Sequence, residues 1–215
     1  MIEEYIMISR RTMLKNLAVL GMAGTCGLLF SQKGAAGQMD FGAYKGKILI
    51  AYFSRTGENY GVGNIAKGNT EIVAEFIQQN IGGELFHIEP AAAYPDTYDE
   101  CVALAKKEKN ANARPELAKS LESIKEYDVI FLGFPNWWSD MPMPVYTFIE
   151  QFDFTGKIIV PFCTHEGSGL GSIPQKIAGA CKGASVLKGL AVRGSAAQNS
   201  QKTVQDTVNK WLADL

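Results

Sequence analysis

Residues 47–57 read KILIAYFSRTG, and the fold of the chain can be worked out by starting from this stretch. The uninterrupted apolar run from Ile48 to Phe53 predicts a strand of a parallel sheet, because such strands are covered on both faces. A polar, glycine-rich segment follows from Ser54 to Asn69. From Thr70 onward the apolar residues fall on one face of a helix. The stretch therefore opens a unit of strand, loop and helix.

The same alternation of apolar runs and amphipathic stretches continues to the C-terminus. Four further strands are expected at residues 84–88, 129–133, 157–163 and 185–192. Helices are expected at residues 70–77, 97–109, 145–151, 173–181 and 204–212. Pro161 lies inside the fourth strand and cannot donate a ladder hydrogen bond, so we expect a local bulge there. Five strands alternating with five helices predict an α/β fold with a doubly wound five-stranded parallel sheet.

Composition narrows the classes of function. The 215 residues suit one domain, and the formal net charge of −1 gives no reason to expect a nucleic-acid partner. The chain has no C-x-x-C pair, and its two histidines, His87 and His165, lie far apart in the sequence. Because a zinc site needs several ligands at short spacing, no metal site is expected.

The first 37 residues are expected to be an export signal rather than part of the fold. Residues 9–15 read SRRTMLK and precede an apolar run at 17–30, with small residues at 34–37 as a cleavage zone. The motif resembles the twin-arginine (Tat) signal, which directs folded proteins across a bacterial membrane. An uncleaved N-terminal anchor, or a lipid on Cys26, is the alternative.

These observations divide the chain into a signal at 1–37, a linker at 38–46 and one domain at 47–215. The protein is then expected in the periplasm or on the outer face of the cytoplasmic membrane. If the signal is not functional, the protein is expected in the cytoplasm.

Ligands of doubly wound sheets bind outside the carboxyl ends of the strands, where the strand order reverses. The loop after the first strand combines hydroxyl groups with the N-terminus of a helix, which suits a phosphate monoester. The residues expected at this anion site are Ser54, Arg55, Thr56, Gly57, Asn69 and Thr70. A capped helix after a glycine turn would show the same pattern. The lysine of a nucleoside-triphosphate P-loop is missing, which argues against ATP or GTP.

The loop after the third strand carries Pro135, Asn136, Trp137 and Trp138. Two adjacent tryptophans in a loop favour contact with a flat heteroaromatic ligand, although packing on the following helix is the alternative.

The loop after the fourth strand offers glycines for close backbone approach and polar groups for hydrogen bonds. Its candidate binding residues are Thr164, His165, Gly167, Ser168 and Gly169. His165 with Glu166 is also a candidate proton relay, but no catalytic residue is firmly assigned.

On this fold, the three loops together resemble those of the flavodoxin family, over residues 47–215. The resemblance implies the strand order 2-1-3-4-5 and an FMN whose phosphate lies in the first loop. That loop matches the family pattern in two pieces, Ser54–Gly57 and Asn69–Thr70, as in a subgroup whose inserted residues loop out. Trp137 matches the aromatic residue that contacts the flavin ring, and Trp138 stands where many flavodoxins have glycine. Residues 164–169 match the loop around the pyrimidine end of the flavin.

Three functions are compatible with this sequence. The first is an FMN-binding redox protein that transfers electrons between partner proteins or to small, quinone-like acceptors. The second is an NAD(P)H-dependent quinone or azo reductase, although no G-x-G-x-x-G fingerprint is present. The third is a flavin-free binding module on the same fold. The nearly neutral charge differs from the strongly acidic character of typical flavodoxins.

Overall fold

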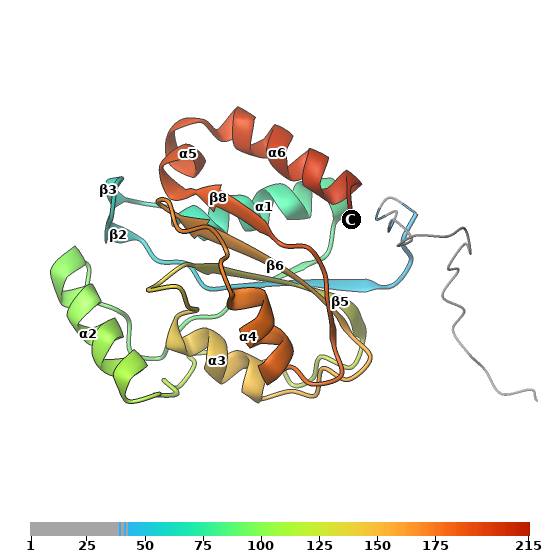
Figure 1. Ribbon diagram of the computed structural model, residues 1–215, viewed down its shortest axis with the longest axis horizontal. Coiled ribbons are helices and arrows are strands. Elements are labelled where there is room, and N and C mark those ends of the chain that lie inside the picture. Colours follow the sequence, from blue (N-terminus) through green and yellow to red (C-terminus); the bar gives the residue numbers. More distant parts are fainter. Residues whose placement is uncertain (1–38, 40, 42) are drawn as a thin grey trace, which may run out of the picture. The chain divides into compact units, whose positions relative to one another are not determined.

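The computed structural model describes residues 39, 41 and 43–215 (Figure 1). The expected export signal at 1–37 lies outside the described residues. Within the described part, no helix is both long enough and apolar enough to cross a membrane.

A parallel sheet forms the centre of the domain, as the sequence predicts. Its strands, in spatial order, are β4 (Glu84–His87), β1 (Lys47–Tyr52), β5 (Tyr127–Pro135), β6 (Ile158–His165), and then β7 (Ser185–Val186) with β8 (Leu190–Arg193), which both pair with β6. If β7 and β8 are taken as two pieces of the fifth strand, the order is 2-1-3-4-5. The α/β doubly wound fold is therefore confirmed.

Pro161 lies inside β6, but it causes no bulge there. The pairing of β6 with β5 runs without a register shift from Val129 opposite Ile158 to Pro135 opposite Thr164. Ile159 accepts a hydrogen bond from the Leu187 N–H at 2.9 Å, so Pro161, two residues further on, faces the same side. The fifth strand is broken there, at residues 187–189. The missing N–H of Pro161 thus coincides with a gap in the neighbouring strand, and the expected bulge was wrong.

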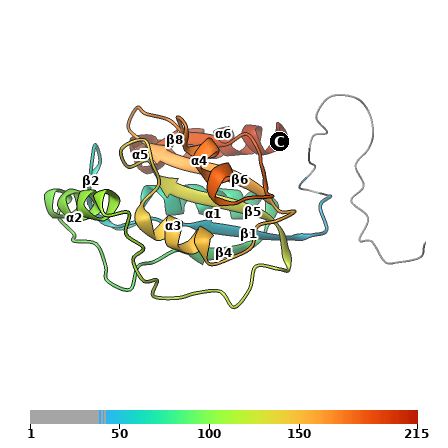
Figure 2. The ribbon, with the colours of Figure 1, turned by 60° about the horizontal axis from the view of Figure 1, so that its bottom comes forward.

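Helices cover both faces of the sheet (Figures 1 and 2). On one face lie α1 (Asn69–Ile81), α5 (Gly194–Asn199) and α6 (Gln201–Ala213), and on the other lie α3 (Met143–Glu150) and α4 (Ile173–Ala180). The remaining helix, α2 (Tyr98–Asn110), lies beyond the carboxyl ends of the strands in both views. It therefore stands beside the edge at which ligands of such sheets bind.

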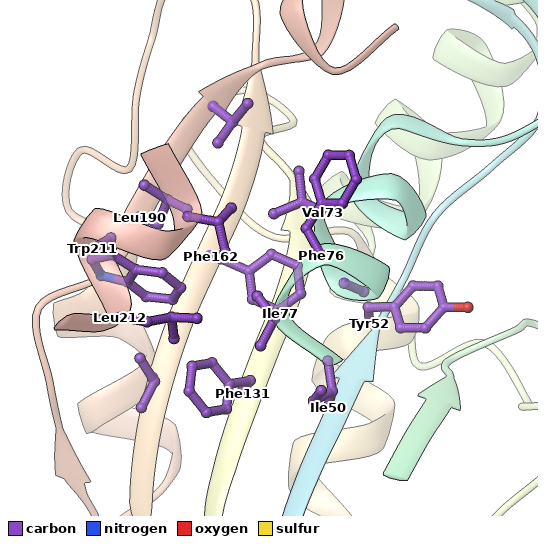
Figure 3. Packing of buried hydrophobic residues seen from close by; sticks show 14 of the residues in the cluster. Ile50, Tyr52, Val73, Phe76, Ile77, Phe131, Phe162, Leu190, Trp211 and Leu212 are labelled. Atoms are coloured by element: carbon purple, nitrogen blue, oxygen red, sulfur yellow. The ribbon is translucent and has the colours of Figure 1, made fainter. Parts of the chain in front are cut away.

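The core has one half on each face of the sheet. Under α1 and α6, Phe131 and Phe162 of the sheet meet Trp211, whose ring lies edge-on to Phe131 at 5.8 Å (Figure 3). Phe41, in the stretch expected to be a linker, is also buried here, with its ring 5.5 Å from that of Phe131. Part of residues 38–46 thus packs onto the domain.

The segment inserted into the first loop has regular structure. It forms a hairpin of two short antiparallel strands, β2 (Gly57–Asn59) and β3 (Gly63–Ile65). Gly57, Gly61 and Gly63 all have positive φ angles, between 71° and 77°, which glycine adopts without the penalty that a Cβ atom brings. We call residues 57–65 the hairpin; α2 packs against its first strand.

Candidate functional site

A cavity of about 230 Å³ opens at the carboxyl edge of the sheet. Its inner wall comes from the loops after β1, β5 and β6 and from the start of α1 and α5. Its outer wall comes from the hairpin and α2. The inner-wall residues are Arg55, Asn69, Pro135, Asn136, Trp137, Trp138, Thr164, His165, Glu166 and Gly194, and the outer-wall residues are Asn59, Tyr60, Tyr98, Cys101, Val102 and Ala105. The cavity lies where β1 and β5 are neighbours, which is the point of strand reversal.

Two of the three hydroxyl groups expected to bind phosphate are engaged within the protein. Ser54 is buried, and its Oγ accepts the backbone N–H of Glu71 at 3.1 Å. A Cβ atom on Gly68 would lie 2.0 Å from that Oγ, so this contact requires glycine. Thr70 is 1% exposed, and its Oγ1 is 2.9 Å from the Oγ1 of Thr164. These hydroxyls fasten the start of α1 to the ends of β1 and β6.

The start of α1 offers backbone groups instead. The first hydrogen bond within the helix runs from the Ile72 N–H to the Gly68 carbonyl at 3.2 Å, and the Glu71 N–H is taken by Ser54. The amides of Asn69 and Thr70 precede these bonds and carry the partial positive charge of the helix end. Asn69 lines the cavity, and Thr56 is exposed in the loop before it. An anion therefore has a donor set here without an additional cation.

The Arg55 side chain is held by backbone carbonyl groups. Its guanidinium donates to Glu58 at 2.5 Å, to Pro95 at 2.7 Å and to Asp96 at 3.0 Å. The Glu58 N–H donates to the same Asp96 carbonyl at 2.8 Å. Arg55 lines the cavity, but its donors fasten the hairpin to the loop that precedes α2.

Trp137 is packed edge-on against other rings. Its ring centre lies 5.4 Å from that of Phe53 and 5.3 Å from that of Tyr94, with interplanar angles of 78° and 84°. Tyr94 in turn donates a hydrogen bond to Glu108 of α2. Trp138 differs, because 45% of its surface is exposed. One tryptophan is therefore locked into the wall and the other projects at the mouth of the cavity.

The backbone of this loop has an unusual conformation. Trp138 and Ser139 have φ angles of 54° and 57°, the left-handed region that residues with a Cβ atom rarely adopt. Lys109 of α2 donates to the Trp138 carbonyl at 3.2 Å, and Lys176 of α4 donates to the Ser139 carbonyl at 3.1 Å. The two lysines also meet at the Asp140 carboxylate, at 3.1 Å and 2.6 Å. We call Asp140, Lys109 and Lys176 the Asp140 latch.

The surroundings of Asp140 favour its ionised form. Burial by itself would raise the pKa of Asp140, but hydrogen bonds from Lys176, Tyr146 and Lys109 outweigh burial and lower it. The carboxylate is 14% exposed, and it also accepts the Tyr146 hydroxyl at 2.8 Å and the Met141 N–H at 2.9 Å. The latch therefore holds both left-handed residues from two different helices.

The third loop is joined to the second by Asn136. Its N–H donates to the Thr164 carbonyl at 2.8 Å, and its side-chain amide donates to the Gly169 carbonyl at 2.6 Å. His165 accepts the Gly167 N–H on Nδ1 at 2.8 Å. Burial and the nearby charge of Arg193 lower the pKa of His165, so the imidazole is neutral at pH 7.

Glu166 lies beside His165, but its carboxylate serves the start of α5. It accepts the Ser195 N–H at 2.6 Å and the Ser195 hydroxyl at 2.9 Å. No hydrogen bond joins Glu166 to His165 within the described part of the chain. The two side chains thus share the cavity without a direct hydrogen bond between them.

The structure brings together eight of the residues predicted from the three loops: Arg55, Asn69, Pro135, Asn136, Trp137, Trp138, Thr164 and His165. Ser54, Thr56, Gly57, Thr70, Gly167, Ser168 and Gly169 are not part of the cavity wall, although several of them fix residues that are. Sequence reasoning missed the outer wall. Cys101 and Ala105 lie on the buried face of α2, but the helical pattern could not reveal that this face borders a cavity.

A doubly wound sheet with a helix N-terminus and an aromatic loop at its reversal point is typical of proteins that bind a nucleotide or a nucleotide-like cofactor. The family model that matches the chain, over residues 47–213, is that of flavodoxin. The chain belongs to the flavodoxin family.

Solved structures agree with this assignment. A candidate flavoprotein of Bacteroides uniformis is 30% identical, with 77% of this chain and 99% of that chain covered and a TM-score of 0.62. A candidate flavoprotein of Bacteroides eggerthii is 29% identical, with 77% and 98% covered and a TM-score of 0.61. A flavoprotein of Lactobacillus acidophilus, solved in complex with FMN, shares the fold at 21% identity and a TM-score of 0.54, with 74% and 99% covered. No curated protein matches the chain.

Proposed function

We propose that the protein binds one FMN in this cavity and transfers electrons between a redox partner and an acceptor. The observation that carries this proposal is that the N-terminal end of α1, at Asn69, and the aromatic wall of Trp137 and Trp138 line the same cavity. A terminal phosphate fits the first feature and a flat ring fits the second. No second nucleotide-binding signature accompanies them in the sequence, which favours FMN over FAD. The fold shared with the L. acidophilus flavoprotein, solved with FMN, supports the same choice.

The residues present suit this cofactor. The amides of Asn69 and Thr70 and the exposed Thr56 hydroxyl would hold the phosphate, and Trp137 and Trp138 would contact the ring. Both carbonyls at the left-handed turn are already bonded to lysines, so the aromatic loop is fixed before the ligand arrives. When bound, FMN would supply the redox chemistry.

The chain itself would orient the ring and limit its contact with water. Trp137 is held edge-on by Phe53 and Tyr94, so its position does not depend on the ligand. Neutral His165 adds no charge to the cavity at pH 7, and its Nδ1 is occupied by the Gly167 N–H. The outer wall closes the side of the cavity opposite the sheet.

A second candidate is a reductase that takes electrons from NAD(P)H and delivers them to a small quinone or azo compound. The outer wall of hairpin and α2 favours it, because a cleft with walls on two sides suits a small substrate better than an open edge does. Rapid bleaching of the bound flavin by NADPH alone, followed by turnover with a quinone, would select this candidate.

The proposal is tested by the absorption spectrum of the protein purified without residues 1–37, and by its released cofactor. We expect a yellow protein with the visible absorption bands of a bound flavin, on the order of one FMN per chain, and FMN as the species released by acid. Recovery of FAD, or a colourless protein that added FMN cannot colour, would contradict the proposal.

A further inference from the structure

In the part of the chain that the structure describes, the large exposed apolar side chains lie at the mouth of the cavity. Among the described residues, the large hydrophobic side chains that are exposed are Tyr60, at 67%, and Trp138, at 45%. Both line the cavity, one from the hairpin and one from the loop after β5. Exposed aromatic rings in a hollow mark a site where a ligand covers them.

A third ring extends this mouth. Tyr98 of α2 lies with its ring centre 6.0 Å from that of Tyr60, at an interplanar angle of 36°. The Tyr98 N–H donates to the Glu58 carboxylate at 2.9 Å, and Glu58 belongs to the hairpin that carries Tyr60. The bonds of Arg55 to Glu58, Pro95 and Asp96 fasten the same two segments. The two tyrosines are therefore positioned relative to each other before any ligand binds.

The charged groups that line the cavity already have partners. The Arg55 guanidinium is taken by three backbone carbonyls, and the Glu166 carboxylate by the N–H and hydroxyl of Ser195. His165 shares the cavity with them and carries no charge at pH 7. Apart from the backbone donors at the start of α1, which the FMN phosphate would use, a charged ligand would find no counter-ion here that is not already engaged, and its loss of water would go uncompensated.

The small extent of the patch argues for a small molecule. A stable protein interface buries about 800 Å² on each partner, with several apolar or aromatic anchors. Two exposed rings around one cavity are too few for such an interface, but they match one flat ligand. The nearly neutral chain also lacks the field that would steer a strongly charged protein partner.

We propose that Tyr60, Tyr98 and Trp138 form an outer subsite that binds a neutral, planar aromatic small molecule beside the cofactor. This inference rests on the proposed function, because it names the class of molecule that would reach the bound FMN. Tyr60 and Tyr98 supply rings from the outer wall, and Trp138 supplies one from the inner wall, where it would also border the flavin. Glu58 and Arg55 act as positioning residues. Neutral quinones belong to this chemical class.

The experiment uses three probes that differ in one property each and undergo no redox reaction. They are 2-naphthol, the anion 2-naphthalenesulfonate, and the saturated alcohol decahydro-2-naphthol, each titrated calorimetrically into the FMN-loaded protein at pH 7. We expect saturable binding of 2-naphthol, and at least tenfold weaker binding of each of the other two. Equal or tighter binding of the sulfonate or the saturated alcohol, or no saturable binding of 2-naphthol, would overturn the proposal.

Variants then locate the probe. Tyr60→Leu and Trp138→Leu should each weaken 2-naphthol by about three- to tenfold, the loss expected for one aromatic contact, while Tyr60→Phe retains binding. If both leucine variants bind 2-naphthol like the parent, the subsite is elsewhere and the proposal fails. If Tyr60→Leu weakens FMN as strongly as 2-naphthol, Tyr60 belongs to the cofactor wall and the proposal also fails. Failure of the proposed function looks different, because the parent itself would then take up no FMN.

Discussion

Replacement of Asp140 by asparagine should loosen the aromatic loop and destabilise the domain. The Asp140 carboxylate is the common partner of Lys109 at 3.1 Å and Lys176 at 2.6 Å, in a position where it is only 14% exposed. Both lysines contact Oδ2, whereas the Tyr146 hydroxyl and the Met141 N–H donate to Oδ1. Asparagine keeps one acceptor oxygen, so its amide donor faces either both ammonium groups or the two donors at Oδ1. At least one charged hydrogen bond is therefore lost, and two half-buried cations lose the charge that compensates them.

The size of the effect follows from these contacts. Hydrogen bonds to charged groups contribute about 1.5–3 kcal/mol each when shielded, and exposed ion pairs contribute about 0–1 kcal/mol. Because the lysine side chains are 31% and 36% exposed, an intermediate value of about 1–1.5 kcal/mol applies to each of the two lysine contacts. We expect Asp140→Asn to lower the free energy of unfolding by about 2–3 kcal/mol and Tm by roughly 5–10 °C.

Chemical denaturation, followed by far-ultraviolet circular dichroism, measures the change. Asp206→Asn is the matched control, since Asp206 pairs with Lys202 at 3.1 Å on the surface, where the two side chains are 62% and 86% exposed. That variant should stay within about 0.5 kcal/mol of the parent. If Asp140→Asn is no more destabilising than Asp206→Asn, the latch does not hold the loop.

The pH dependence provides a second check on the same variant. The folded protein lowers the pKa of Asp140, so its contribution is present above the ordinary value of 3.8 and is lost as the pH falls through the lower, folded value. The difference in stability between parent and variant should therefore be complete at pH 7 and should shrink below about pH 4. A difference that stays constant down to the acid transition would mean that the charge of Asp140 is not responsible.

Four further predictions concern single side chains of the site. Thr56→Ala should weaken FMN by about 1–3 kcal/mol but leave riboflavin unaffected, as measured by fluorescence titration; equal losses would remove Thr56 from the phosphate site. Arg55→Lys should weaken FMN and riboflavin alike, because the guanidinium holds carbonyl groups; a loss restricted to FMN would make it a phosphate ligand. Trp137→Ala should raise the fluorescence of bound flavin and weaken its binding at least a few-fold, and unchanged quenching would show that Trp137 only packs. The folded protein lowers the pKa of His165, so the contribution of the neutral imidazole to stability is present above about pH 6.5 and is lost below it. In thermal melts from pH 7.5 to 5, the Tm of His165→Asn should therefore decline less than that of the parent, and equal declines would contradict this.

Sequence periodicity predicted the sheet well, because each strand of a parallel sheet is a short apolar run between helices. It failed at the fifth strand, where residues 185–192 were expected to be continuous. Whether a strand continues depends on the N–H groups that its neighbour offers, and Pro161 of β6 offers none. That information lies more than twenty residues away in the sequence. A bulge was expected in β6 at Pro161, whereas the interruption lies in the neighbouring strand.

The candidate site was predicted in part for a similar reason. Residues 135–138 and 164–165 lie at or directly after the carboxyl ends of β5 and β6, so the fold alone brings them together. The outer wall depends on where α2 lies, and its amphipathic pattern predicts a buried face without saying what covers it. Arg55 looked like an anion ligand, but its sequence context could not reveal the carbonyls of Pro95 and Asp96, some forty residues away.

The gap between β7 and β8 also has a consequence for how copies of this protein behave at high concentration. An uninterrupted strand at the rim of a sheet is a template on which another chain can add a strand and begin to aggregate. Here that rim consists of pieces of two and four residues. Within the gap, the Lys188 carbonyl accepts the Trp211 indole N–H at 3.0 Å, so it is not available to an incoming chain. The proline that breaks the ladder inside the molecule thus also protects its border from self-association.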